Sequence, residues 1–193
     1  MTGEERLRRD EAAGPPRSEA AAKRQRSERG FKVALEHPAQ ALASAFLRAL
    51  AEGAAAAVWD GLSRESKGLL EGAYAARTNV VLHRAAGVGS EAGDERLAQV
   101  VAPLREAALR ACGGEARVLA FGVSAARLVD RRTAYVLLLP DFGEERIVAE
   151  ADWHPAHLLA FTHESREWLV DLGRTAALSA EAGLPDPLGD IRP

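Results

Sequence analysis

The stretch RTAYVLLL, residues 132–139, decides the fold class of this chain. Side chains of a β-strand alternate between two faces, so the odd-numbered residues from Tyr135 to Leu139 share one face and the even-numbered residues from Ala134 to Leu138 share the other. Both faces are apolar and must be covered. We expect helices from the first half of the chain on one face, and a further layer or a second subunit on the other.

Other β-type runs stand on both sides of this stretch, at the spacing of hairpins. They are Arg117 to Val129, Arg146 to Ala151, His157 to Thr162 and Trp168 to Leu172. The connections between them are mostly short, which favours sequential antiparallel pairing over parallel units with crossover helices. The sequence therefore predicts an α+β fold in which the N-terminal helices pack on an antiparallel sheet.

Helical patterns fill the first half. Pro38 suits a first helical turn, and apolar residues recur from there at three-to-four spacing until Gly53. Ser63 can cap a further helix, and Asp94 can cap another that runs to Gly113 with Pro103 inside it. The segment from Tyr74 to Arg84 fits either a short strand or an apolar segment under the helices.

Composition divides the chain into three parts. Residues 1–35 are rich in charge and poor in large apolar side chains, which predicts a disordered charged tail. Residues 36–175 form the single folded domain, since 193 residues with 47% hydrophobic content suit one core. Residues 176–193 lose the strand pattern and carry several prolines, so we expect an irregular C-terminal tail.

Charge and cysteine content exclude several classes of protein. The net charge is −3, which argues against nucleic acid and anionic membranes as partners. The first 32 residues carry nine basic and six acidic side chains; a basic arm is one reading, but the interspersed acids favour a solvating tail. Cys112 is the only cysteine, and no apolar run reaches the length of a membrane span. We expect a soluble, cytoplasmic protein.

Three segments together carry a family resemblance. They are the helix ending at Gly53, the turn Val58-Trp59-Asp60-Gly61-Leu62-Ser63, and the closing strand Glu167-Trp168-Leu169-Val170-Asp171-Leu172. The pattern resembles the nuclear transport factor 2-like superfamily, which includes SnoaL-like polyketide cyclases and ketosteroid isomerases. The resemblance implies a sheet wrapped around helices into a cone, the cystatin-like α+β barrel, with a pocket at the wide end and homodimers formed through the sheet.

Candidate catalytic residues cluster between two of the strands. Asp152, His154 and His157 could act as acid and base, as in a SnoaL-like isomerase, cyclase or hydratase. The same types of residue bind zinc or iron, but Pro155 breaks the alternation that would bring them together, so we expect no metal site. Solvent-exposed loop histidines are the alternative.

Candidate pocket residues are aromatic. Trp59, Tyr74 and Trp153, with Trp168, could line a cavity for an apolar ligand, although such residues more often belong to a core. The glycine pattern of Gly87 to Ala92 matches a dinucleotide loop, but hairpins follow it in place of a parallel repeat, so we expect no cofactor. The leading hypothesis is a domain that binds a small apolar ligand or serves in dimerisation; an acid–base enzyme is the alternative.

Overall fold

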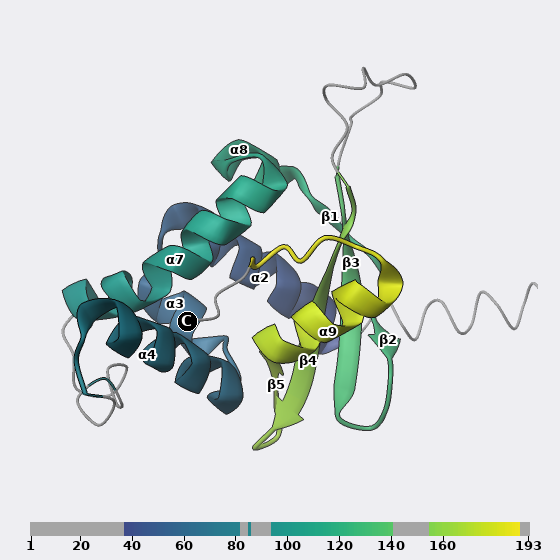
Figure 1. The fold of residues 1–193 in the computed structure, drawn as a ribbon. Coiled ribbons are helices and arrows are strands. Elements are labelled where there is room, and N and C mark those ends of the chain that lie inside the picture. Colours follow the sequence, from purple (N-terminus) through teal and green to yellow (C-terminus); the bar gives the residue numbers. More distant parts are fainter. Residues whose placement is uncertain (1–36, 82–84, 86–93, 141–154, 190–193) are drawn as a thin grey trace, which may run out of the picture. The chain divides into compact units, whose positions relative to one another are not determined.

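The computed structural model describes residues 37–81, 85, 94–140 and 155–189. The chain divides into units 1–33 and 34–193, and every described residue belongs to the second. The helices are α2 (Pro38–Glu52), α3 (Ala55–Asp60), α4 (Arg64–Thr78), α7 (Asp94–Cys112), α8 (Glu115–Ala120) and α9 (Leu172–Ala182). The strands are β1 (Gly122–Val123), β2 (Arg127–Leu128), β3 (Thr133–Leu139), β4 (His157–Glu164) and β5 (Glu167–Val170). The α+β class is confirmed, with helices first and strands after them (Figure 1).

The strands form one curved antiparallel sheet (Figure 1). Its order is β1, β3, β4, β5, and β2 also pairs with β3. The RTAYVLLL stretch is confirmed as a strand and pairs with β4 from Thr133 opposite Thr162 to Leu138 opposite His157. The two-residue turn between β4 and β5, Ser165-Arg166, has φ angles of 47° and 76°, which match the twist that a tight hairpin needs.

One face of the sheet meets α2 and builds the core. Its fully buried side chains include Val136 of β3, Leu159 and Phe161 of β4, and Val170 of β5. Because each sits opposite an apolar partner on the neighbouring strand, the face is continuously apolar across the three strands. This is the layer of helices that the sequence predicts on one face.

Helix α9 packs on β4 from the opposite face, which corrects the prediction of an irregular tail from residue 176 (Figure 1). Asp171 begins the helix by accepting the N–H of Arg174 at 2.9 Å, and Gly183 ends it at φ 66°. The pattern misled because Thr175 and Ser179, which face inward and are buried, are not apolar. Over β4, therefore, a further layer of this chain covers the second face.

The segment after α9 is irregular but packed. Leu188 is 2% exposed and belongs to the core. Gly189 lies so close to α7 that an added Cβ would stand 2.6 Å from the Cβ of Ala107. The segment thus contributes to the core instead of trailing into solvent.

The strand predicted over Arg117 to Val129 is partly wrong, because residues 115–120 form α8. Only two short pieces, β1 and β2, follow, and they flank the side chain of Ser124. The Ser124 hydroxyl accepts the N–H of Leu137 at 2.9 Å in place of a backbone partner, so the edge of the sheet bends there.

Helix ends follow the local signals well. His37 accepts the N–H of Ala39 through Nδ1 at 3.2 Å and caps α2, whose far end is Gly53 at φ 70°. Ser63 caps α4, which takes in the first part of the ambiguous segment and ends at Thr78. Helix α7 runs unbroken through Pro103. None of the helices in the described part of the chain is long and apolar enough to cross a bilayer.

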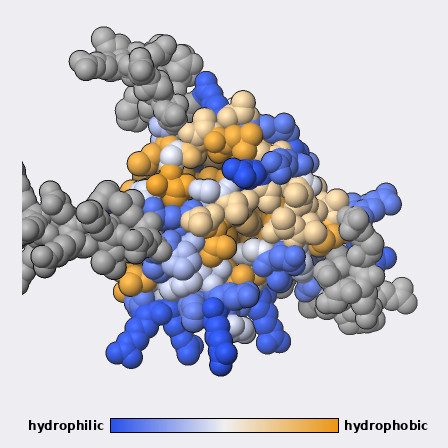
Figure 2. All heavy atoms as spheres, turned by 180° about the vertical axis from the view of Figure 1, so that it is seen from behind, coloured by the Kyte–Doolittle hydropathy of each residue, from blue (hydrophilic) through white to orange (hydrophobic). Residues whose placement is uncertain are grey.

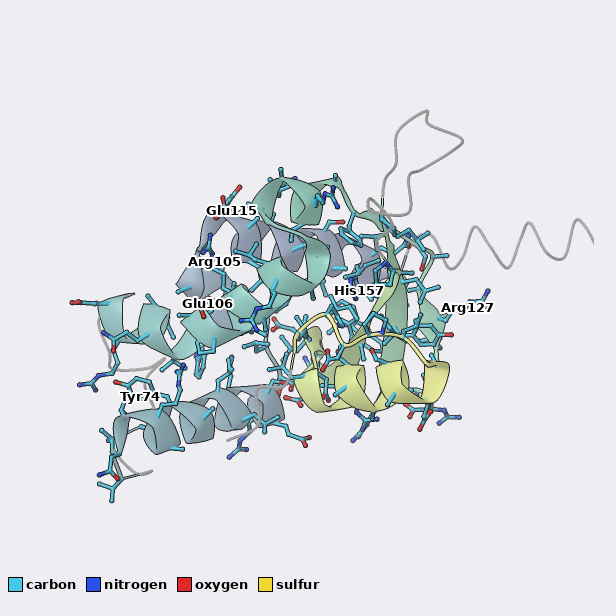
Figure 3. The ribbon with its side chains drawn as sticks, turned by 45° about the horizontal axis from the view of Figure 1, so that its top comes forward. Tyr74, Arg105, Glu106, Glu115, Arg127 and His157 are labelled. Carbon is cyan, nitrogen blue, oxygen red and sulfur yellow. The ribbon has the colours of Figure 1, made fainter. Side chains whose placement is uncertain are left out.

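Arg105 ties three helices together. Its Nε and Nη2 donate to the carbonyl oxygens of Leu50 and Ala51 at 2.9 and 3.0 Å, at the C-terminal end of α2. Its guanidinium also pairs with Glu115 of α8, and Figure 3 shows the two side chains close together. A cation on the carbonyls at the C-terminal end of a helix stabilises that end, so α2 is fixed against α7 and α8.

Candidate functional site

A cavity of about 330 Å³ lies between α2, α3 and the sheet. Its lining residues come from α2 (Leu42, Ala45, Phe46, Ala49), from α3 and the residue after it (Ala57, Asp60, Gly61), and from the sheet (Phe161, Trp168, Val170). Asp60 is the only charged residue among them. The site is therefore a hydrophobic hollow with a single carboxylate in its lining.

Helix α2 supplies one wall through its periodicity. The residues at helical spacing from Leu42 to Ala49 present one stripe, and the small side chains of Ala45 and Ala49 beside Leu42 and Phe46 leave the space open. Gly61 closes one end, where an added Cβ would stand 3.3 Å from Phe46. Leu42 is 36% exposed, so the wall reaches the surface.

Trp168 lies between two imidazole rings beside this cavity. Its ring is 4.8 Å from that of His37, edge to face, and 5.1 Å from that of His163, measured between centroids. Partial burial lowers the pKa of His37, which favours the neutral imidazole that can accept the capping hydrogen bond. The two rings limit the positions that the Trp168 side chain can take.

The corner between α3 and α4 is attached to β5 by buried hydrogen bonds. The Ser66 hydroxyl accepts the N–H of Leu172 at 2.9 Å and lies 2.8 Å from the hydroxyl of Ser63. The backbone of Val170 exchanges bonds with Gly61 and Ser63, at 2.8 and 2.9 Å. These bonds bring together the two tryptophan-containing segments of the sequence pattern and hold Gly61 at the end of the cavity.

The candidate catalytic residues are not brought together in the described part of the chain. Asp152 and His154 lie outside the described residues. His157 is 1% exposed, its Nδ1 is 3.2 Å from the carbonyl oxygen of Pro185, and its ring centroid is 5.8 Å from that of Phe121 (Figure 3). His157 does not line the apolar cavity.

The candidate pocket aromatics have different outcomes. Trp153 lies outside the described residues. Trp59 is buried in the core, with the ammonium of Lys67 5.7 Å from its ring centre, and Tyr74 packs half-buried against the same core. Neither lines the cavity, whereas Trp168 does. The core alternative holds for Trp59 and Tyr74, and the cavity reading holds for Trp168.

Phe46 and Phe161 are lining residues that the sequence did not single out as such. Phe46 belongs to the helical stripe and Phe161 to a strand, so each was visible as an apolar position. No local signal separates a cavity wall from a filled core, because the difference depends on what stands opposite. Alanines at positions 45, 49 and 57 opposite two phenylalanines are the nearest thing to such a signal.

The described part of the chain contains neither a cluster that could hold a metal ion nor a reactive thiol. Among those residues, no group of three histidine, cysteine or acidic side chains is arranged to hold a metal ion. Cys112 is buried, and burial raises the pKa of its thiol to about 11, which disfavours the reactive thiolate. The glycine loop from Gly87 to Ala92 lies outside the described residues.

Comparison with known proteins leaves the family open. No protein-family model, curated protein or solved structure matches the chain significantly. The argument for function therefore comes from the cavity and its surroundings.

Proposed function

We propose that this domain binds a small apolar molecule in the cavity between α2 and the sheet. The observation that carries the proposal is an open space of about 330 Å³ in which nine of ten lining residues carry no charge. Binding sites for small molecules are concave and mostly apolar, and their volumes begin near this size. Removing apolar surface from water on both ligand and walls supplies the binding free energy.

The exposed surface beside the cavity supports this proposal. Figure 2 views the molecule from the side where α2 lies and shows hydrophobic residues in a band across the middle of that face. Leu42, on α2, is 36% exposed and also lines the cavity. An apolar surface beside an apolar cavity suits an apolar ligand.

We extend the proposal to the family: the chain is a divergent nuclear transport factor 2-like domain with a cystatin-like cone. Support comes from the contact between the turn at Gly61 to Ser63 and the strand ending at Val170, since these are the segments on which the resemblance rests. A cavity between the sheet and its helices also fits such a cone. An experimental structure with a nuclear transport factor 2-like strand order would be expected; any other order would contradict it.

The ligand proposal is tested by filling the cavity. Ala45→Phe places a ring at the wall, whereas Ala41→Phe adds the same ring to an exposed position of α2 outside the lining. The neutral fluorophore N-phenyl-1-naphthylamine is titrated into each full-length variant. We expect bright fluorescence with the wild type and Ala41→Phe, and at least about tenfold weaker binding to Ala45→Phe. Equal binding to both variants, or none to the wild type, contradicts the proposal.

A second proposal is a homodimer through the edge of the sheet. Leu128 and Val129, at and beside the edge strand β2, are 63% and 52% exposed, and an exposed apolar edge invites pairing with another chain. Sedimentation at micromolar concentrations should show a dimer that Leu128→Glu converts to a monomer. A strict monomer for the wild type contradicts this part.

Of the three residues proposed for acid–base catalysis, one lies in the described part of the chain. That residue, His157, is enclosed by Phe121 and the Pro185 carbonyl. A general acid or base must reach a substrate atom, and this imidazole does not line the cavity proposed for a ligand. No observation on the described residues favours the enzyme over the binding protein.

A further inference from the structure

We propose that the ligand is an amphipathic carboxylate whose apolar part fills the cavity and whose acid group meets arginines beyond His163. This inference rests on the proposed function and narrows it to one class of molecule. Its basis is a second hollow, which is polar and is lined by His163, whose ring lies 5.1 Å from that of Trp168 in the lining of the apolar cavity.

One pair of facing residues on β4 and β5 links the linings of the two hollows. Trp168 lines the apolar cavity, and His163, its partner across the hairpin, lines the polar hollow of about 820 Å³. The N–H of His163 donates to the carbonyl oxygen of Arg132 at 2.8 Å, which places Arg132 opposite His163, one step beyond the last pair of β3 and β4. Directly paired residues share a face, so Arg132, His163 and Trp168 form one row.

The next row along the strands is the floor of the apolar cavity. Phe161 and Val170 are paired in it, two residues before His163 and two after Trp168. Two residues of a strand span about 7 Å. A molecule lying along the strands therefore passes from hydrophobic to cationic surroundings over the length of a short organic acid.

Arginines dominate the charge of the polar hollow. Arg64, Arg132 and Arg166 come from three separate elements and line it, and in the described part of the chain none of their guanidinium groups has an ion-pair partner. A guanidinium presents a planar pair of donors that matches the two oxygens of a carboxylate. The hollow thus offers cationic donors that form no ion pair within the described residues.

Two carboxylates, Glu65 and Glu164, also line the polar hollow, so three arginines outnumber two acids there. Glu164 accepts the backbone N–H of Arg64 at 3.2 Å, at the start of α4. Glu65 extends toward Gly173, where an added Cβ would be 3.9 Å from its Oε1. Asp130 accepts the N–H of Arg132 at 2.6 Å, which lowers the pKa of its carboxyl group and fixes the arginine backbone. The remaining acid, Asp60, lines the apolar cavity and would repel an acid group lodged there.

The test compares 4-phenylbutyrate with its neutral amide, 4-phenylbutyramide, in ligand-observed NMR titrations of the full chain. Both contain the same apolar group. In the acid, the distance from this group to the charge is close to the distance between the row of Phe161 and Val170 and the row that contains Arg132. We expect both to bind, with the acid about fivefold tighter at low salt. The difference should shrink at high salt, because the charges are exposed to solvent.

Two double variants test whether the preference for the acid over the amide depends on the arginines of the polar hollow. Arg132→Gln with Arg166→Gln should remove the preference for the acid and leave the affinity for the amide unchanged. Arg110→Gln with Arg127→Gln, two exposed arginines outside the hollow, removes the same net charge and should leave the preference intact; Figure 3 shows Arg127 extending away from the ribbon.

The outcomes separate this inference from the proposal on which it rests. Equal binding of acid and amide, or a preference that survives loss of Arg132 and Arg166, overturns the inference alone. Binding of neither compound overturns the proposed function together with it. Acid binding that Ala45→Phe leaves unchanged means that the carboxylate alone is bound, which overturns the joint site.

Discussion

The two faces of the sheet are packed in different ways. Toward α2, a cavity of about 330 Å³ remains, lined by large side chains such as Phe46 of the helix and Phe161 of the sheet and by small alanines. Toward α9, the facing residues are small: Ala160 and Thr175 are fully buried, and the Ala160 N–H donates to the Thr175 hydroxyl at 3.0 Å. The large side chains keep α2 at a distance from the sheet, whereas the small ones let α9 lie close to the backbone of β4.

The contrast shows how one sheet can be closely packed on its α9 face and still leave a cavity on its α2 face. On the α9 side, the hydroxyl of Thr175 and the N–H of Asp171 satisfy the edge of β4 where β5 has ended. The α2 side makes no such bonds to the sheet and depends on apolar burial, which tolerates an empty space at moderate cost. We therefore expect the α9 face to resist substitution and the α2 face to accept it where the cavity lies.

The largest effect should follow from loss of the floor of the cavity. Phe161→Ala removes a fully buried ring that lies against α2, and should lower the free energy of unfolding by about 3 to 5 kcal/mol. Denaturant titration measures the change. A loss below about 1 kcal/mol would mean that Phe161 is poorly packed and that α2 is not held by this face.

Adding volume should distinguish the two faces directly. Ala160→Leu, under α9, overfills a closed interface and should cost about 1 to 3 kcal/mol. Ala49→Leu, in the cavity wall, adds the same carbon atoms to empty space and should be neutral or stabilising by up to about 1 kcal/mol. Similar losses for the two variants would show that the cavity cannot take a side chain, and the comparison would fail.

The hydrogen bond under α9 should contribute less. Thr175→Val keeps the shape of the side chain but leaves the Ala160 N–H without its acceptor, which should cost about 1 to 2 kcal/mol. Thr78→Val is the control, since that hydroxyl bonds to the Tyr74 carbonyl on an exposed helix surface. Equal small losses at both positions would show that the buried bond has no special weight.

The smallest effect concerns pH at the start of α2. The pKa of His37 lies below its ordinary value of 6.5 in the folded protein because the ring is partly buried. The unfolded chain therefore binds the proton more readily, and stability falls as pH drops through 6.5 toward the folded pKa. His37→Asn keeps a capping side chain without the titration. Its stability should fall less between pH 8 and pH 5 than that of the wild type; identical slopes contradict the assignment.

Much of the fold was predictable because its signals are local. Pro38 and Gly53 bound α2 as expected, Ser63 caps α4, and the alternation of residues 132–139 gives β3. Each depends on a few neighbouring residues, through a fixed φ, a capping side chain or a strand period. Helices first and antiparallel strands afterwards follow from the same signals.

The errors in the fold have a common cause. Helix α9 was missed because its buried stripe contains Thr175 and Ser179, which are polar; the Thr175 hydroxyl accepts the N–H of Ala160, a residue distant in sequence. Residues 117–120 read as a strand but form part of α8, where tertiary packing outweighs a short alternating pattern.

The candidate site was less predictable than the fold. The candidate pocket residues chosen from the sequence were Trp59, Tyr74 and Trp153, whereas Trp168 lines the cavity, and Trp59 and Tyr74 pack in the core. The difference lies in what stands opposite each ring: two imidazoles and an open hollow for Trp168, close-packed side chains for Trp59. Sequence shows that a residue is aromatic but not the volume left beside it.

The sequence by itself determined which residues form helices and strands in most of the domain. It also determined that the strands pair in antiparallel fashion. Both depend on hydrogen bonding and on the period of side chains over a few residues. Only the tertiary structure decided that α9 covers the second face, that a hollow remains under α2, and that Arg132, His163 and Trp168 form one row. Such features arise between segments far apart in the chain, where the shapes of both partners fix the distance between them.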